Sequence, residues 1–138
     1  ASLLATASSR PLGTAGARVM VSRQLAASGG IWLDLHGTRL LIDPGPGSLV
    51  RAVSLGLDPA TLSAIFLSHR HLDHSSDVNV MIEAMSSGGF KPRGRVYAPA
   101  DCFGAEPVIF NYLERFVDGF TGLEAGGRYD IGEVTVTT

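Results

Sequence analysis

The chain has 138 residues, of which 45% are apolar and 17% are charged. This length and apolar fraction suit one domain, residues 1–138, with its own hydrophobic core, which argues against intrinsic disorder and against a second domain within these residues. Eleven Lys and Arg residues against thirteen Asp and Glu residues give a formal charge of −2, and because the positive charges form no run, a broad basic face for nucleic acid is not expected.

No stretch of the sequence reaches the ~18 consecutive apolar residues that a membrane helix needs. The single cysteine, Cys102, cannot form an intramolecular disulfide. A lone cysteine fits a reducing compartment and is interpreted as a small buried apolar residue. We therefore expect a soluble, cytoplasmic protein that does not insert into membranes.

The first half of the chain predicts strands separated by turns and one short helix. A short strand is predicted over residues 19–21, and residues 31–35 and 38–43 are expected to pair as a hairpin through the turn His36-Gly37. The prolines of residues 44–47 end the second strand, because proline cannot donate to a sheet ladder. Ser48 is then expected to cap a helix that runs to about Leu55.

The second half continues the alternation of helices and strands. Asp58-Pro59 predicts a single helical turn, and residues 64–67 form an apolar run typical of a buried strand. A helix beginning at Ser76 or Asp77 carries apolar residues at helical spacing. Predicted elements beyond it are a strand at 95–98, a helix at 107–117 and a strand at 134–136. This order predicts an α/β fold.

One cluster of side chains is typical of a metal-binding site. His69, His71 and His74 lie within six residues, with Asp73 among them, directly after the predicted buried strand. In an extended segment residues two apart point to the same side, so His69 and His71 can share one metal ion. Asp73 and His74 then reach around the turn toward a second ion. Nitrogen and carboxylate ligands suit zinc best, and iron or manganese would also be accepted.

Other residues near this cluster have weaker signals. Asp43 follows a strand, which should bring its carboxylate to the same end of the sheet as the histidines. We expect it to orient a ligand imidazole or nearby backbone, the alternative being a turn-forming aspartate. Residues 45–48 could bind an anion, but Pro46 has no N–H to offer, so a plain loop is preferred. Arg70 is interpreted as a structural or surface charge, and His36 as an exposed turn residue.

The segment Ser68-His69-Arg70-His71-Leu72-Asp73-His74 resembles the His-x-His-x-Asp-His signature of the metallo-β-lactamase superfamily. Residues 41–45 look like the strand-end aspartate of that family, and residues 96–99 are similar to its strand and turn after the first motif helix. Residues 12–16 are similar to the glycine-rich first loop of its ribonuclease Z and phosphodiesterase branch. The resemblance implies an αββα sandwich and a site with two metal ions.

The pattern of the family is not complete in this sequence. The resemblance implies a further histidine for the first metal, an aspartate that bridges both metals and a last histidine, all downstream of the motif, and none can be placed. The remaining histidine, His36, precedes the motif. We therefore expect an amino-terminal half, truncated before the later metal-ligand motifs: half of an αββα sandwich, with a mixed sheet and flanking helices.

Half of a sandwich would leave one face of its sheet uncovered. A few hundred Å² of exposed apolar surface costs several kcal/mol at about 25 cal/mol per Å², which is comparable with the roughly 5–15 kcal/mol net stability of a domain. We expect the strands at 31–35, 40–42 and 65–67 to seek a partner surface. A homodimer or a complementary carboxy-terminal half would provide one.

These observations lead to a functional hypothesis. The expected reaction is metal-assisted hydrolysis of a small-molecule or nucleotide phosphodiester at two zinc ions, with Asp73 placed to accept a proton from the attacking water. Thioester or lactone hydrolysis is the alternative chemistry. A second alternative is a catalytically incomplete metal-binding or self-associating half-domain, because four candidate ligands cannot saturate two ions.

Overall fold

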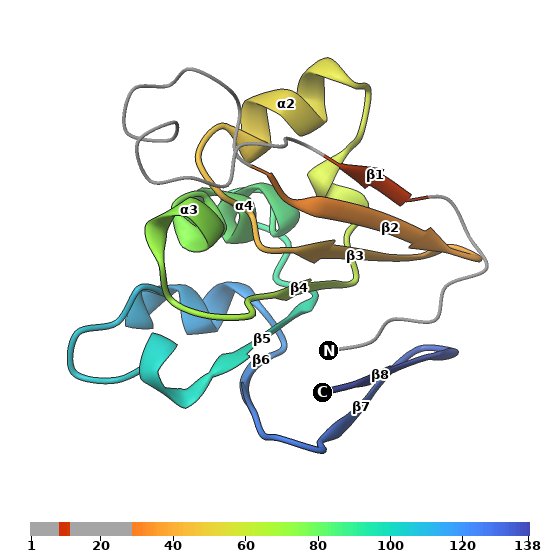
Figure 1. Ribbon diagram of the computed structural model, residues 1–138. Helices are drawn as coiled ribbons and strands as arrows, with labels where there is room; N and C mark the ends of the chain where they lie inside the picture. Colours follow the sequence, from red (N-terminus) through yellow and green to blue (C-terminus); the bar gives the residue numbers. More distant parts are fainter. Residues whose placement is uncertain (1–8, 12–28) are drawn as a thin grey trace.

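The computed structural model describes residues 9–11 and 29–138 (Figure 1). The strand predicted at 19–21 and the glycine-rich loop at 12–16 lie outside the described residues. The strands are β1 (Ser9–Pro11), β2 (Ile31–Leu35), β3 (Thr38–Ile42), β4 (Ala64–Phe66), β5 (Arg95–Pro99), β6 (Gly119–Leu123), β7 (Arg128–Ile131) and β8 (Val134–Thr137). The α-helices are α2 (Ser48–Ser54), α3 (Leu72–Ser75) and α4 (Val78–Met85), and the 3-10 helices are η1 (Pro59–Thr61), η2 (Ala100–Cys102) and η3 (Asn111–Phe116).

Six of these strands form one mixed sheet in the order β1-β2-β3-β4-β5-β6. The β1–β2 and β2–β3 pairs are antiparallel, whereas β3, β4, β5 and β6 run parallel. Parallel neighbours need crossover connections, and α2 with η1, then α4, then η3 occupy these crossovers. The predicted mixed sheet with flanking helices is confirmed. Among the described residues, no helix is both long and apolar enough to cross a membrane.

The predicted hairpin is confirmed as β2 and β3. Its register pairs Ile31 with Ile42 and Leu35 with Thr38. Both turn residues have positive φ, 54° at His36 and 89° at Gly37, as a two-residue turn that matches the strand twist requires. His36 is exposed in this turn.

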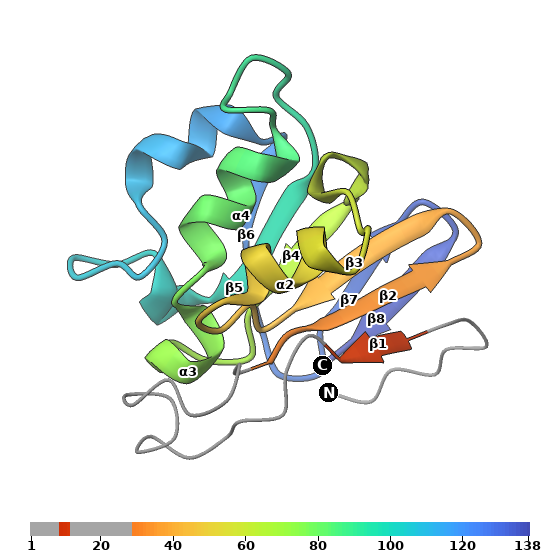
Figure 2. The same cartoon turned by 90° about the horizontal axis from the view of Figure 1, so that it is seen from above.

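The helices cover one face of the sheet, where Figure 2 shows α2 and α4 in front of the strands. Buried side chains from the strands and from the helical layer form one apolar cluster on this face. Its members include Trp32, Leu41, Ile65, Val96, Ala52, Leu62, Met81, Met85, Cys102 and Leu113. The stripe predicted for the helix after the motif is confirmed, because Val78, Met81, Ile82 and Met85 of α4 are all fully buried.

The opposite face is covered by the β7–β8 hairpin, which lies behind the main strands in Figure 2. Ile131 and Val136 of this hairpin join a second apolar cluster with strand residues that include Leu33, Leu40 and Phe66. These strand side chains are at most 5% exposed. The expectation of an uncovered sheet face is therefore wrong, because the local hairpin buries it. Self-association stays a prediction, but it loses this argument.

The start of α2 differs from the expectation that Ser48 caps it. The capping position is held by Gly47, whose φ is 84° and which has no side chain to bond the first turn. The carboxylate of Asp77 takes over this role from a distant part of the chain, because its Oδ2 accepts from the N–H of Leu49 at 2.9 Å. The Asp77 N–H also donates to the carbonyl of Pro44 at 2.9 Å. Asp77 therefore ties the start of α4 to the start of α2.

The carboxy-terminal part contains two further differences. The helix predicted at 107–117 is wrong except for the short 3-10 helix η3, because the preceding backbone bonds elsewhere. The N–H groups of Val108 and Ile109 donate to the carbonyl of Cys102, and that of Phe110 donates to the Asn79 side chain. Strands β6 and β7 were not predicted, since glycines in β6 and exposed charged residues in β7 hide the usual alternation.

Replacing Asp77 by Ala should destabilise the fold by about 0.5–2 kcal/mol, the range for loss of a helix N-cap. The reason is that the Leu49 N–H loses its acceptor. The free energy of unfolding, measured by urea denaturation, checks this. Asp77→Asn keeps a side-chain oxygen and should retain most of the stability. Equal stability of Asp77→Ala and the unchanged protein would contradict this role.

The thiol of Cys102 should react slowly while the protein is folded. The residue is fully buried, and burial together with the neighbouring Asp101 carboxylate raises the pKa of the thiol to about 11. Because the reactive thiolate is disfavoured by the fold, alkylation at pH 8 should be slow in buffer and fast in guanidinium chloride. The raised pKa also means that stability falls as the pH rises above 9. Fast alkylation under native conditions would contradict the burial of this residue.

Candidate metal centre

The candidate ligands gather at one edge of the sheet, where the parallel strands β3 and β4 end. Asp43 follows β3 directly, and Ser68 and His69 follow β4 after one further buried residue. The Asp43 N–H donates to the carbonyl of Phe66 at 2.9 Å, which joins the ends of the two strands. Asp43 therefore lies at the same end of the sheet as the histidine motif.

The motif divides between an extended segment and the first turn of a helix. His69 and His71 precede α3, whereas Asp73 and His74 lie within it, and this single turn was not predicted. The hydroxyl of buried Ser75 donates to the carbonyls of Arg70 and His71 at 3.1 and 3.0 Å. These two bonds hold the extended segment against the helical turn.

The four side chains converge. The ring centroid of His69 lies 4.8 Å from that of His71 and 4.2 Å from that of His74. Asp73 Oδ2 lies 3.4 Å from His74 Nε2. One donor atom from each of His69, His71 and Asp73 lies within 4.8 Å of the other two. Two imidazoles and a carboxylate at this spacing fit a divalent ion such as zinc.

A second group of three donors includes Asp43 with His69 and His74. The Asp43 carboxylate is already engaged within the protein: Oδ1 accepts from the Ser68 N–H at 2.7 Å, and Oδ2 lies 2.6 Å from the Ser68 hydroxyl. Oδ2 also lies 3.1 Å from His74 Nδ1. Since both oxygens have protein partners, the geometry favours Asp43 as a support for the histidines over Asp43 as a ligand.

The backbone of Asp43 is left-handed, with φ of 52°. Aspartate and asparagine tolerate this conformation better than most residues. The left-handed residue ends β3 and turns the chain into the loop of residues 44–47. In that loop the Gly45 N–H donates to the carbonyls of Gly29 and Asp43, which fits the plain-loop interpretation.

Two residues near the cluster have hydrogen-bond partners that the sequence did not reveal. Ser68 contacts both Asp43 and His69, and its only sequence signal is its position directly before the first histidine. Arg70 donates to the Glu106 carbonyl at 2.9 Å, which anchors the motif to the loop after η2. The expectation that Arg70 is a structural charge agrees with this contact.

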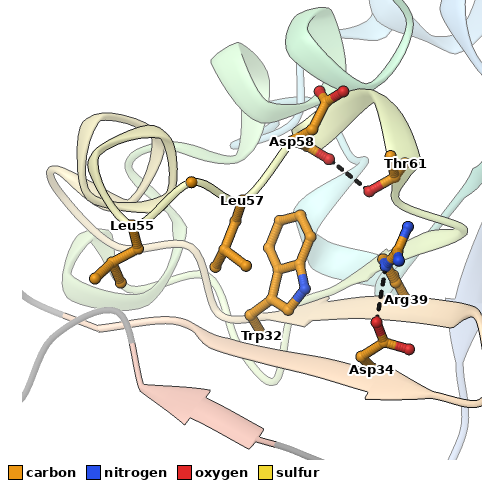
Figure 3. A pocket seen from close by; sticks show the side chains of 8 residues that line it. Trp32, Asp34, Arg39, Leu55, Leu57, Asp58 and Thr61 are labelled. Atoms are coloured by element: carbon orange, nitrogen blue, oxygen red, sulfur yellow. Dashed lines mark hydrogen bonds and ion pairs between the residues drawn. The ribbon is translucent and has the colours of Figure 1, made fainter.

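A separate hollow of about 440 Å³ lies beside β2, β3 and η1 (Figure 3). Its polar groups are paired with one another: Arg39 Nε lies 2.9 Å from Asp34 Oδ2, and the Thr61 hydroxyl donates to the Asp58 carbonyl. The Arg39 guanidinium, together with the Gly37 N–H, lowers the pKa of Asp34. At about 3.3 Å per residue, Arg39 lies roughly 13 Å along the chain from Asp43. This hollow is therefore distinct from the histidine cluster.

Comparison with known proteins identifies relatives. Residues 38–138 match the model of a β-lactamase superfamily domain. An uncharacterised protein of Methanocaldococcus jannaschii is 39% identical over 129 residues, which cover 91% of this chain and 48% of that protein. A ribonuclease Z of Methanopyrus kandleri is 38% identical over 127 residues, which cover 92% of this chain and 43% of that enzyme.

Solved structures agree on the fold. The crystal structure of a diphosphatase from the PhnP family aligns with a TM-score of 0.65 at 17% identity, covering 94% of this chain and 54% of that one. The chain thus spans about half the length of the curated relatives it matches. Its fold corresponds to about half of the diphosphatase structure. The family match begins at β3, the second strand of the hairpin, and extends over the histidine motif and all later strands; on this basis the chain belongs to the metallo-β-lactamase superfamily.

Proposed function

We propose that this chain contributes metal ligands and a water-activating carboxylate to a phosphodiester hydrolase. The observation that carries the proposal is the convergence of His69, His71 and Asp73 donor atoms within 4.8 Å. The name ribonuclease Z of a relative at 38% identity favours a phosphodiester over a thioester or lactone.

The proposed roles follow the two halves of the motif. His69 and His71 would hold one ion, and Asp73 and His74 a second, with zinc as the metal that best suits these donors. When bound, such ions act as Lewis acids toward a phosphodiester and lower the pKa of water. Asp43 orients His74 through the contact between Oδ2 and Nδ1.

Asp73 is the proposed proton acceptor. Its side chain is only 14% exposed, and Oδ2 lies 3.4 Å from His74 Nε2. A partly buried carboxylate held on the first turn of α3 has a fixed position relative to both groups of ligands. It can take a proton from the attacking water.

The number of ligands favours a shared site. Four side chains cannot saturate two ions, since each zinc ion usually takes about four ligands. We propose that the missing donors come from outside the described residues, either from additional chain or from a second molecule. The second candidate function, metal binding without turnover by this segment alone, rests on the same ligand count.

Replacing His69 and His71 together by Ala should abolish zinc binding by the purified chain, because the proposed first ion loses both imidazoles. Elemental analysis after dialysis against zinc checks this. His36→Asn is the matched control, since it removes the exposed hairpin histidine and keeps a residue that tolerates positive φ. Unchanged zinc content in the double variant would refute the proposed metal site.

The zinc-loaded segment alone should hydrolyse bis(p-nitrophenyl) phosphate at a rate close to that of buffer, because its ligand set is incomplete. Release of nitrophenolate measures the rate, and a nitrophenyl ester tests the alternative chemistry in parallel. Turnover comparable with that of complete family members, and lost in Asp73→Ala, would show that the ligand count is wrong and that the segment forms a full site.

A further inference from the structure

We propose that Ser68 is a positioning residue whose hydroxyl fixes the tautomer of His69. The hydroxyl holds the ring proton on Nδ1 and leaves the lone pair on Nε2 for a metal ion. This inference rests on the proposed metal centre and adds to it a residue that does not itself ligate. The observation behind it is a continuous hydrogen-bonded chain from Asp43 through Ser68 to His69.

The direction of this chain follows from counting protons. An ionised carboxylate only accepts, whereas a hydroxyl has one proton and two lone pairs. Ser68 Oγ lies 2.6 Å from Asp43 Oδ2, a distance typical of a hydroxyl donating to a charged oxygen. The backbone N–H of Ser68 donates to Oδ1 of the same carboxylate at 2.7 Å. Two bonds between the same two residues leave the hydroxyl proton committed to Asp43.

The contact with His69 then has one direction. Ser68 Oγ lies 2.8 Å from His69 Nδ1, and with its proton already donated it can only accept there. A neutral imidazole has one N–H and one lone pair, so the proton must lie on Nδ1 and the lone pair on Nε2. A hydroxyl polarised by a carboxylate is also a stronger acceptor, which makes the ring a better ligand.

Asp43 thereby determines which ring nitrogen carries the proton in two histidines, directly in one and through Ser68 in the other. His74 Nδ1 lies 3.1 Å from Asp43 Oδ2 and must donate to it, because the carboxylate has no proton to give. His69 is reached through the Ser68 hydroxyl, which lies between its Nδ1 and the Asp43 carboxylate in the hydrogen-bonded chain. Removing the hydroxyl should therefore release His69 and leave His74 unchanged.

The test is the nitrogen-15 NMR spectrum of the histidine rings in the metal-free chain. It is recorded at about pH 8.5, above the pKa of about 6.5 of a free imidazole, and the nitrogen shifts themselves distinguish a neutral ring from a charged one. The proposal expects Nδ1–H for His69 and His74 in the unchanged protein. In Ser68→Ala, His69 should shift to Nε2–H, the form favoured by a free imidazole, while His74 keeps Nδ1–H.

Zinc affinity provides the second readout. Competition with a chromophoric chelator should show about a 10–100-fold weaker affinity in Ser68→Ala, the usual effect of losing such a supporting contact. Ser68→Thr keeps a hydroxyl and should retain both the tautomer and most of the affinity. Ser76→Ala is the matched control, because its hydroxyl donates to the Leu72 carbonyl in the same motif helix.

An Nε2–H form of His69 in the unchanged protein would overturn the proposal, and this decision does not depend on whether any variant folds. Persistence of Nδ1–H in Ser68→Ala would also overturn it, since the hydroxyl would then have only a structural role. If the unchanged chain shows the expected tautomers but binds no zinc, the proposed function fails while the assignment of Ser68 stands.

Discussion

The carboxylate of Asp43 is the interaction on which the arrangement of the histidine cluster depends. It stands at the end of β3 and is bonded to Ser68 at the end of the parallel neighbour β4 through both of its oxygens. The same carboxylate contacts the ring of His74, which lies in α3 within the motif. One side chain therefore joins the end of the hairpin, the start of the motif and the turn that completes it.

This arrangement needs a rigid platform, and burial of β4 provides one. All three residues of β4 are buried, with Ile65 packed in the helical layer and Ala64 and Phe66 packed against the β7–β8 side. A strand that is covered on both faces cannot change register without exposing apolar side chains. The position of the first histidine is thus fixed by the apolar core, and Asp77 fixes the start of α4 by bonding the first turn of α2.

The sequence could predict the features that depend on neighbouring residues. The β2–β3 hairpin has strong strand propensity on both sides of a His-Gly turn, and the motif is compact enough to be recognised directly. The particular partners of distant residues could not be predicted, although the strand-end position of Asp43 indicated that it would lie beside the motif. Asp77 bonds Leu49 across 28 positions, and Ser68 bonds Asp43 across 25. The prediction that Ser48 caps α2 was wrong because the acceptor for the Leu49 N–H is Asp77, which stands at the start of α4.

The covering of the second sheet face also depends on contacts between residues far apart in the sequence. Exposed Arg128 and Asp130 alternate with the apolar residues of β7, so this strand was not predicted, and the strand predicted at 134–136 therefore had no evident hairpin partner. The hairpin of β7 and β8 occupies the sheet face that was expected to be uncovered, and Ile131 and Val136 fill the second core there. The consequence is that the incomplete ligand set, and not an open apolar face, is the reason to expect donors from elsewhere.

A crystal structure of the chain grown with zinc, with the ion located by anomalous scattering, tests the central claim most directly. Zinc should be bound by Nε2 of His69 together with His71 or Asp73, while Asp43 keeps its bonds to Ser68 and His74. Zinc bound to Asp43 itself, to Nδ1 of His69, or only at places remote from the motif would contradict it.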